Sequence, residues 1–223
     1  MFIPFVVGIL LIQSLPSTGQ ILPEAAPSSA DQARKITYSS TQSNPLSSLI
    51  AIASAHQIPL GLILGQKPLL CAAPRSVNVH DADALIVLAE VVKGTGYTIS
   101  LENGVYIVTA PDVSERQKVI LSHRFSSFTT SSRMDATAQY LNGMIAEAVD
   151  GAKGFVLNII STPGEKTVTT GTMENTTSKE VANRVAVQGN NGVWIMEPSG
   201  AFQIFDYGRD AGWQAQLTCS GWK

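Results

Sequence analysis

Apolar residues recur along the first part of the chain at spacings that predict short helices and short strands in alternation. Ile36 and Tyr38 alternate with polar residues, as in a strand. Asn44 before Pro45 is typical of a helix start, because asparagine caps the first turn and proline fits the first helical position. The apolar stripe that follows has helical spacing and consists of Leu46, Leu49, Ile50 and Ala53. We expect the run from Leu60 to Leu64 to form the next strand.

The stretch from Arg75 to Pro111 has the clearest pattern in the chain. Val77 and Val79 indicate a strand, and Asp81 is placed to cap a helix. The apolar stripe of that helix is Leu85, Leu88, Ala89 and Val92. Gly94 is expected to end it.

Asn103 and Gly104 stand between two runs of residues that favour strands. This dipeptide is the strongest short-range signal for a two-residue type I′ hairpin turn. Such a turn pairs Leu101 with Tyr106 and Ile99 with Val108. Ile99 and Leu101 then share one face of the hairpin, and Val105 and Ile107 lie on the opposite face.

A similar order of elements follows in the second half. Ser132 with Asp135, and Thr177 with Glu180, have the spacing of capping boxes before two helices. The strands expected here are Val119–Phe125, Phe155–Ile160, Thr167–Thr172, Val193–Met196 and Phe202–Phe205. Gly189 ends the last helix 95 positions after Gly94 (189 − 94 = 95). We therefore predict an α+β fold of two small modules, 35–111 and 119–208, each running strand, helix, strand, strand, helix, hairpin.

The first residues have a different character from the rest. Residues 1–19 carry no charged side chain and are mostly apolar, and Ser17 and Gly19 are small, as a secretory signal cleaved after Gly19 requires. The alternatives are an uncleaved anchor in the inner membrane and a buried helix. Residues 20–34 are expected to be a linker, because they are rich in proline, alanine and serine. The tail 209–223 receives no assignment.

Composition narrows the possible partners. Fifteen Lys and Arg stand against seventeen Asp and Glu, a formal net charge of -2, and no basic stripe occurs. Nucleic acid is therefore not expected as a partner. No later run reaches the roughly 20 apolar residues of a membrane-spanning helix, so we expect no span after signal removal.

The two cysteines, Cys71 and Cys219, suit one disulfide in an oxidising compartment. Such a bridge would tie the tail to the first module. Two separate buried thiols are the alternative, because sequence does not fix the Cα separation that a disulfide requires.

Catalytic and metal-binding patterns are not found in the sequence. His56, His80 and His123 are scattered, without a paired histidine motif or a Cys-x-x-Cys. No Gly-x-Ser-x-Gly elbow marks a nucleophile. We therefore expect no enzyme, no metal and no cofactor. Two alternatives stay open: an envelope hydrolase with an unrecognised site, and a carbohydrate-binding module that uses Tyr106, Trp194 and Trp213.

The segment from Lys35 to Ala110 resembles the secretin and TonB short N-terminal domain. The resemblance lies in the Asn44-Pro45-Leu46 opening, in the segment VNVHDADALIVLAEVVKGTGYTI and in the closing GVYIVTA hairpin. The second module resembles that family only in its pattern. The resemblance implies a small module that docks onto other envelope proteins, such as a secretin, a TonB-dependent receptor, an anti-sigma factor or an assembly component. The chain is too short to hold the barrel of a secretin or receptor as well.

We therefore expect a non-enzymatic docking module in the periplasm or secreted from a bacterium. Strands such as Val105–Thr109 and Val193–Met196 are apolar on both faces, so they are either covered by the other module or contact a partner. Val105, Ile107 and Trp194 are the candidate contact residues. A partner strand added to a free sheet edge is the expected mode of binding.

Overall fold

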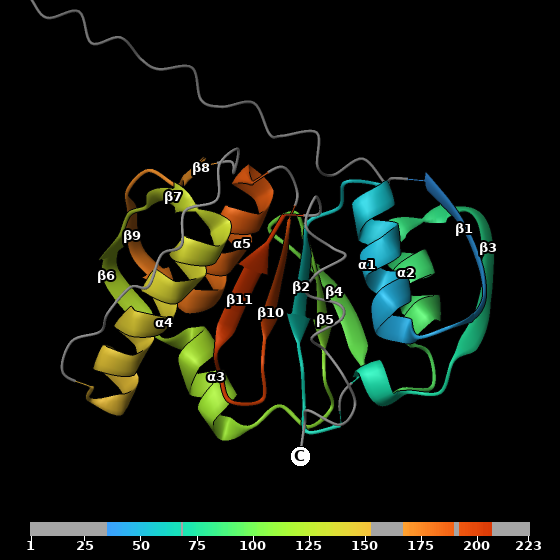
Figure 1. Cartoon of the computed structure of the whole chain (residues 1–223), viewed down its shortest axis with the longest axis horizontal. Helices are drawn as coiled ribbons and strands as arrows, with labels where there is room; N and C mark the ends of the chain where they lie inside the picture. The colour runs from blue at the N-terminus through green and yellow to red at the C-terminus, as the bar shows by residue number, and fades with distance from the viewer. Residues whose placement is uncertain (1–34, 68, 153–166, 190–191, 207–223) are drawn as a thin grey trace, which may run out of the picture. The chain divides into compact units, whose positions relative to one another are not determined.

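A five-stranded sheet forms the centre of the structure, and both halves of the chain contribute strands to it (Figure 1). The structure is a computed structural model that describes residues 35–67, 69–152, 167–189 and 192–206. The elements of the first half are β1 (Lys35–Ser43), α1 (Pro45–Ala55), β2 (Leu60–Ile63), the short 3₁₀ helix η2 (Leu69–Cys71), β3 (Arg75–Asp83), α2 (Ala84–Val92), β4 (Thr98–Glu102) and β5 (Val105–Thr109). Those of the second half are α3 (Glu115–Ser122), β6 (Arg124–Phe128), β7 (Ser131–Arg133), α4 (Met134–Asp150), β8 (Thr167–Thr169), β9 (Met173–Thr177), α5 (Ser178–Gln188), β10 (Val193–Met196) and β11 (Phe202–Phe205).

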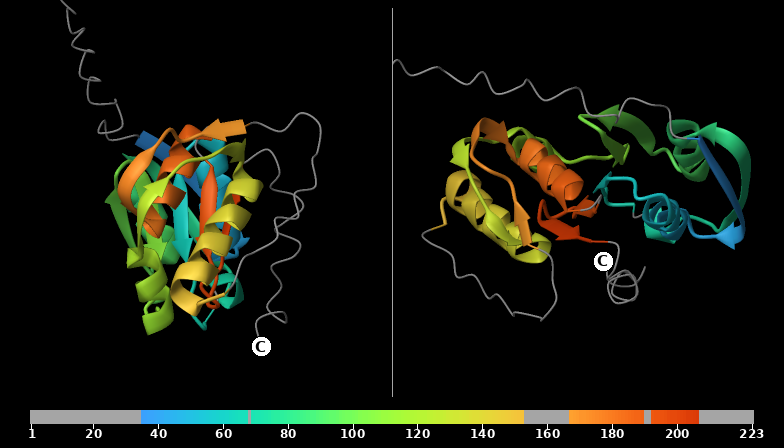
Figure 2. Two further views of the ribbon diagram at one scale, coloured as in Figure 1. Left: turned by 90° about the vertical axis from the view of Figure 1, so that its left-hand side faces the viewer. Right: turned by 90° about the horizontal axis from the view of Figure 1, so that it is seen from above.

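The strand order of the central sheet is β11-β10-β2-β5-β4. Strand β2 lies parallel to β5 on one side and to β10 on the other. The two hairpins, β4-β5 and β10-β11, are antiparallel and extend the sheet outward in opposite directions. The sheet therefore ends at β4 on one side and at β11 on the other, as seen from above in Figure 2.

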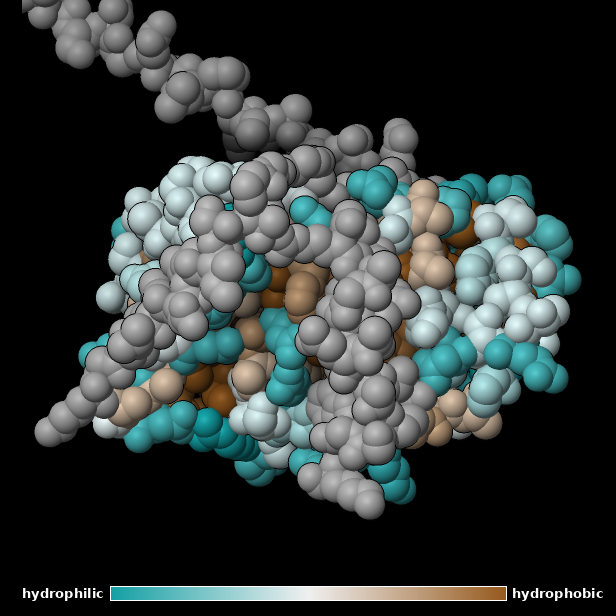
Figure 3. Space-filling model, in the orientation of Figure 1, coloured by the Kyte–Doolittle hydropathy of each residue, from teal (hydrophilic) through white to brown (hydrophobic). Residues whose placement is uncertain are grey.

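Helices cover both faces of this sheet. On one face, α1 and α2 pack against alternate strand residues, including Leu60, Leu62 and Val108. On the other face, α3, α4 and α5 pack against Ile63, Ile107 and Met196, among others. Two-stranded antiparallel ribbons form the outermost layers, β1 with β3 outside the first pair of helices, and β6 with β9 and β7 with β8 outside the second group. In Figure 3, brown apolar side chains lie mainly in the hollows between these layers.

The α+β class predicted from the sequence is confirmed. In the first half the observed order of elements matches the predicted one, with η2 added before β3. In the second half, the predicted strand Phe155–Ile160 lies outside the described residues. The predicted signal 1–19, linker 20–34 and tail 209–223 lie outside them as well.

Three helices share one kind of entry. Gln42, Asp81 and Asn175 each lie three residues before the first residue of α1, α2 and α5, with φ of 51°, 45° and 47°. This left-handed conformation is uncommon outside glycine. In each case a capping side chain follows two residues later, at Asn44, Asp83 and Thr177. The two halves therefore share a local backbone geometry at the start of these helices.

Three local predictions are wrong. Residues 119–122 belong to α3 rather than to a strand, because Ser114 and Gln117 form a reciprocal capping box at its start. Asp83, not Asp81, caps α2, with the Leu85 N–H donating to its Oδ1 at 2.9 Å. The predicted Ser132 and Asp135 box does not form, because Arg133 occupies the capping position and pairs with Asp135.

Candidate functional site: an open sheet edge

The hairpin β4-β5 forms one end of the central sheet. Its turn is the predicted type I′ turn, since Asn103 and Gly104 both have positive φ, 50° and 78°. The register is also the predicted one, with Leu101 opposite Tyr106 and Ile99 opposite Val108. The predicted assignment of side chains to the two faces of this hairpin is therefore confirmed.

The neighbouring strand fixes which backbone groups of β4 point outward. The N–H groups of Tyr106 and Ala110 donate to β2, to the carbonyl oxygens of Pro59 and Ile63. The backbone N–H and C=O groups of the odd-numbered residues of β5 must then point toward β4. There they bond the backbone of Thr98, Ser100 and Glu102. The N–H and C=O groups of Ile99 and Leu101 consequently point away from the sheet.

No described residue bonds these outward groups, and the strand leaves them accessible. Leu101 is 42% exposed and Ile99 is half-buried. Natural sheets protect their edges with proline, lysine or bulges. Strand β4 contains neither of these residues, and its register with β5 is unbroken.

A groove of about 510 Å³ runs beside this edge, between β4 and α2. Ile86, Ala89 and Ile99 contribute apolar surface to it, and Ile86 is 59% exposed. A strand added along β4 would place every second side chain over this groove.

Charged side chains flank the two ends of β4. Beside Thr98, Glu90 pairs with Lys93 at 3.0 Å and with Arg75 at 3.6 Å, which leaves one positive charge in excess. At the opposite end, the Glu102 carboxylate pairs with Lys179 of α5 at 2.5 Å and accepts a hydrogen bond from the Ser100 hydroxyl at 3.0 Å.

The opposite edge of the sheet is covered. The N–H of Glu197 donates to the Ala201 carbonyl oxygen, so the odd-numbered residues of β11 bond β10. The backbone N–H and C=O groups of Phe202 and Ile204 therefore point away from the sheet. Asn142 of α4 donates to the Phe202 carbonyl oxygen at 2.7 Å and accepts from its N–H at 2.8 Å. Phe202 and Ile204 are both buried. One edge of the sheet is thus closed by Asn142, whereas β4 has no backbone partner on its outer side among the residues that the structure describes.

Val105, Ile107 and Trp194, the contact residues predicted from the sequence, each have an exposed fraction of 0%. They lie on the face covered by α3, α4 and α5. Trp194 also donates its Nε1–H to Asn183 Oδ1 of α5 at 2.8 Å. The prediction that these residues contact a partner is therefore wrong. They belong to the hydrophobic core, as the alternative of burial between the two halves predicted, and they present no surface to a partner. The exposed apolar residues at the edge are Ile86 and Leu101 instead.

Sequence reasoning missed these residues for one reason. The pattern fixed the faces of the hairpin, but it could not show which of its two strands lies outermost. That depends on β2 pairing with β5, a parallel contact between strands distant in sequence.

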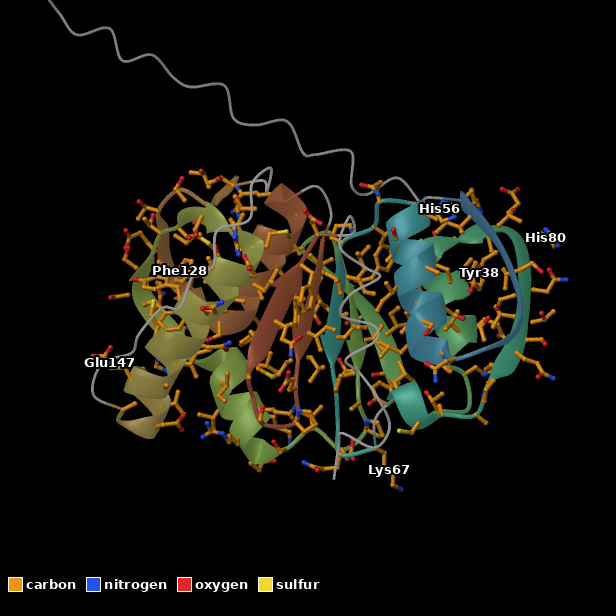
Figure 4. All side chains as sticks on the ribbon, viewed as in Figure 1. Tyr38, His56, Lys67, His80, Phe128 and Glu147 are labelled. Carbon is orange, nitrogen blue, oxygen red and sulfur yellow. The ribbon has the colours of Figure 1, made fainter. Side chains whose placement is uncertain are left out.

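The histidines do not gather into a site. Figure 4 shows His56 and His80 at separate places on the outside of the first half. Within the described ranges, no group of three or more His, Cys, Asp or Glu side chains could hold a metal ion.

A hollow of about 730 Å³ lies between β9 and α5. Several of its polar groups already have structural partners. The Glu180 carboxylate accepts from the Thr177 N–H at 2.6 Å, and Asn183 holds Trp194. These two groups are therefore committed to a helix cap and to the core.

A second hollow, about 670 Å³, lies beside Tyr97 and Cys71. The Tyr97 hydroxyl donates to the Lys67 carbonyl oxygen at 3.0 Å and accepts from the Gly65 N–H at 3.3 Å, and burial raises its pKa. Cys71 is disulfide-bonded. Cys219 lies outside the described residues, so the pairing of the two stays a prediction.

The aromatic residues named for carbohydrate binding are also separated. Trp194 is buried and Tyr106 is half-buried. Trp213 lies outside the described residues. A flat stacking surface for a sugar ring cannot include Trp194.

Comparisons with family models, with curated proteins and with solved structures find no match to this chain. Among the described helices, none has both the length and the apolar character needed to cross a bilayer.

Proposed function

We propose that this chain is an exported, non-enzymatic protein-docking module of the bacterial cell envelope. The observation that carries the proposal is the open edge of β4 beside the apolar groove along α2. Outward backbone groups at Ile99 and Leu101 can pair with a strand of a partner, and the groove can take its apolar side chains.

The chemistry of the edge defines the partner segment. It is an extended strand with alternating apolar and polar residues, because only one side of β4 faces the groove. Its polar side chains would lie on the face of Ser100 and Glu102, where Glu102 and Lys179 form an ion pair. The partner classes that fit are those implied by the resemblance of residues 35–110 to the secretin and TonB short N-terminal domain.

Export rests on the uncharged, apolar character of residues 1–19. Cleavage after Gly19 would leave a mature protein that begins at Gln20. The intact mass of the protein recovered from a periplasmic fraction tests this step. A mass that includes residues 1–19 would favour the uncleaved anchor.

The docking site is tested with a photoreactive side chain placed at Leu101 in the producing cell. Val119 is the matched control, because it is an exposed apolar residue, 52% accessible, on helix α3. We expect an adduct with another envelope protein from position 101 and none from position 119. The same adducts from both positions, or none from position 101, would contradict docking at β4.

A further inference from the structure

The open edge of β4 is self-complementary. In an antiparallel pair, two residues with outward backbone groups exchange both of their hydrogen bonds. Ile99 and Leu101 are the outward residues of β4, and Ser100 lies between them. A two-fold axis through Ser100, perpendicular to the sheet, relates β4 to β4 of a second copy. Ile99 of each copy then lies opposite Leu101 of the other. This register forms four backbone hydrogen bonds.

The side chains suit this register on both faces. On the α2 side, Ile99 and Leu101 meet their counterparts as two cross-strand apolar pairs, which stabilise antiparallel strands. On the opposite side, Glu102 lies across from Thr98 of the other copy, so no like charges are opposed.

We propose that β4 pairs with β4 of a second copy of this chain, centred on Ser100, and that the two central sheets join into one of ten strands. The inference shares its edge with the proposed docking function but requires no other protein. A pairing of five residues is small for an interface, so the dimer is expected to be weak and open to exchange with a partner strand.

Ser100→Cys in the full chain tests the axis directly. Residues opposite each other in a non-hydrogen-bonded pair have Cβ atoms about 4.5–5.5 Å apart, close to the span of a disulfide. Under mild oxidation we expect a covalent dimer on a non-reducing gel. Val119→Cys is the matched control and should stay monomeric. A monomeric Ser100→Cys chain, or equal crosslinking of both variants, would overturn the proposal.

Sedimentation of the unmodified chain provides the second readout, from about 1 μM to about 500 μM. We expect the average mass to rise toward twice the monomer mass, and the rise to be lost in Leu101→Lys but not in Val119→Lys. Circular dichroism of each variant shows whether it folds. A chain that stays monomeric throughout would refute the dimer while leaving partner docking intact. A dimer whose Leu101 position crosslinks only to another copy would refute partner docking instead.

Discussion

Asn142 closes one edge of the central sheet by bonding both backbone groups of Phe202 that point outward. A single side-chain amide thus replaces one residue of a neighbouring strand. The other edge, at β4, has no such cover among the described residues. This difference between the two edges is the basis for assigning docking to β4.

Asn142→Ala should destabilise the fold by about 1–3 kcal/mol, because it leaves a buried N–H and C=O without partners. Asn142→Asp is the matched variant, since a carboxylate can accept from the Phe202 N–H but cannot donate to its carbonyl oxygen. We expect Asn142→Asp to lower the free energy of unfolding by at least the contribution of one hydrogen bond. Urea unfolding measures both variants. An unchanged midpoint for Asn142→Ala would show that the amide does not close the edge.

Gly61 lies beneath the ring of Trp194 at the centre of the sheet. A Cβ at position 61 would lie 2.4 Å from Cζ2 of Trp194 and 2.8 Å from Cδ1 of Ile107. Gly61→Ala should therefore cost about 1–3 kcal/mol through overpacking.

A double-mutant cycle separates this clash from other effects of alanine. Trp194→Phe reduces the ring, so Gly61→Ala should cost less in that background than in the unmodified chain. Simple additivity in urea unfolding would show that the Trp194 ring does not limit position 61.

Acid should weaken the cap of α5. The Thr177 N–H bonds the Glu180 carboxylate and holds the pKa of that group below its ordinary value of 4.5. The unfolded chain then binds more protons than the folded chain as the pH falls below about 4.5. The contribution of Glu180 is therefore present above this pH and is lost as the pH falls through the folded pKa.

Glu180→Gln removes this titration while keeping an acceptor for the cap. Its unfolding free energy should fall less steeply between about pH 5 and pH 3 than that of the unmodified chain. Glu147→Gln, at an exposed position on α4 in Figure 4, serves as the control for removing a carboxylate outside the α5 cap. Equal slopes in all three proteins would contradict a structural role for the Glu180 charge.

Local signals in the sequence predicted the structure where one interaction dominates. The Asn103-Gly104 turn set the hairpin register, and Thr177 with Glu180 set the start of α5. Residues 119–122 were misassigned because Val119 and Ile120 favour strands, whereas the Ser114 and Gln117 box upstream starts a helix.

Contacts between distant segments could not be predicted in this way. The parallel pairing of β2 with β10 joins the two halves, and it buries Trp194 against Gly61. A strand that binds a partner and a strand covered by helices have the same pattern of apolar residues along the sequence. This pattern alone therefore could not show that Val105, Ile107 and Trp194 lie in the core. The open edge became visible only when the order of strands was known.

Amide hydrogen exchange along β4, followed residue by residue by NMR, tests the open edge most directly. In dilute protein we predict fast exchange at Ile99 and Leu101, whose N–H groups point outward, and slow exchange at Ser100, which bonds β5. A docked strand should slow Ile99 and Leu101 and leave Ser100 unchanged. Exchange at Ile99 and Leu101 that is already as slow as at Ser100 in dilute protein would contradict the account.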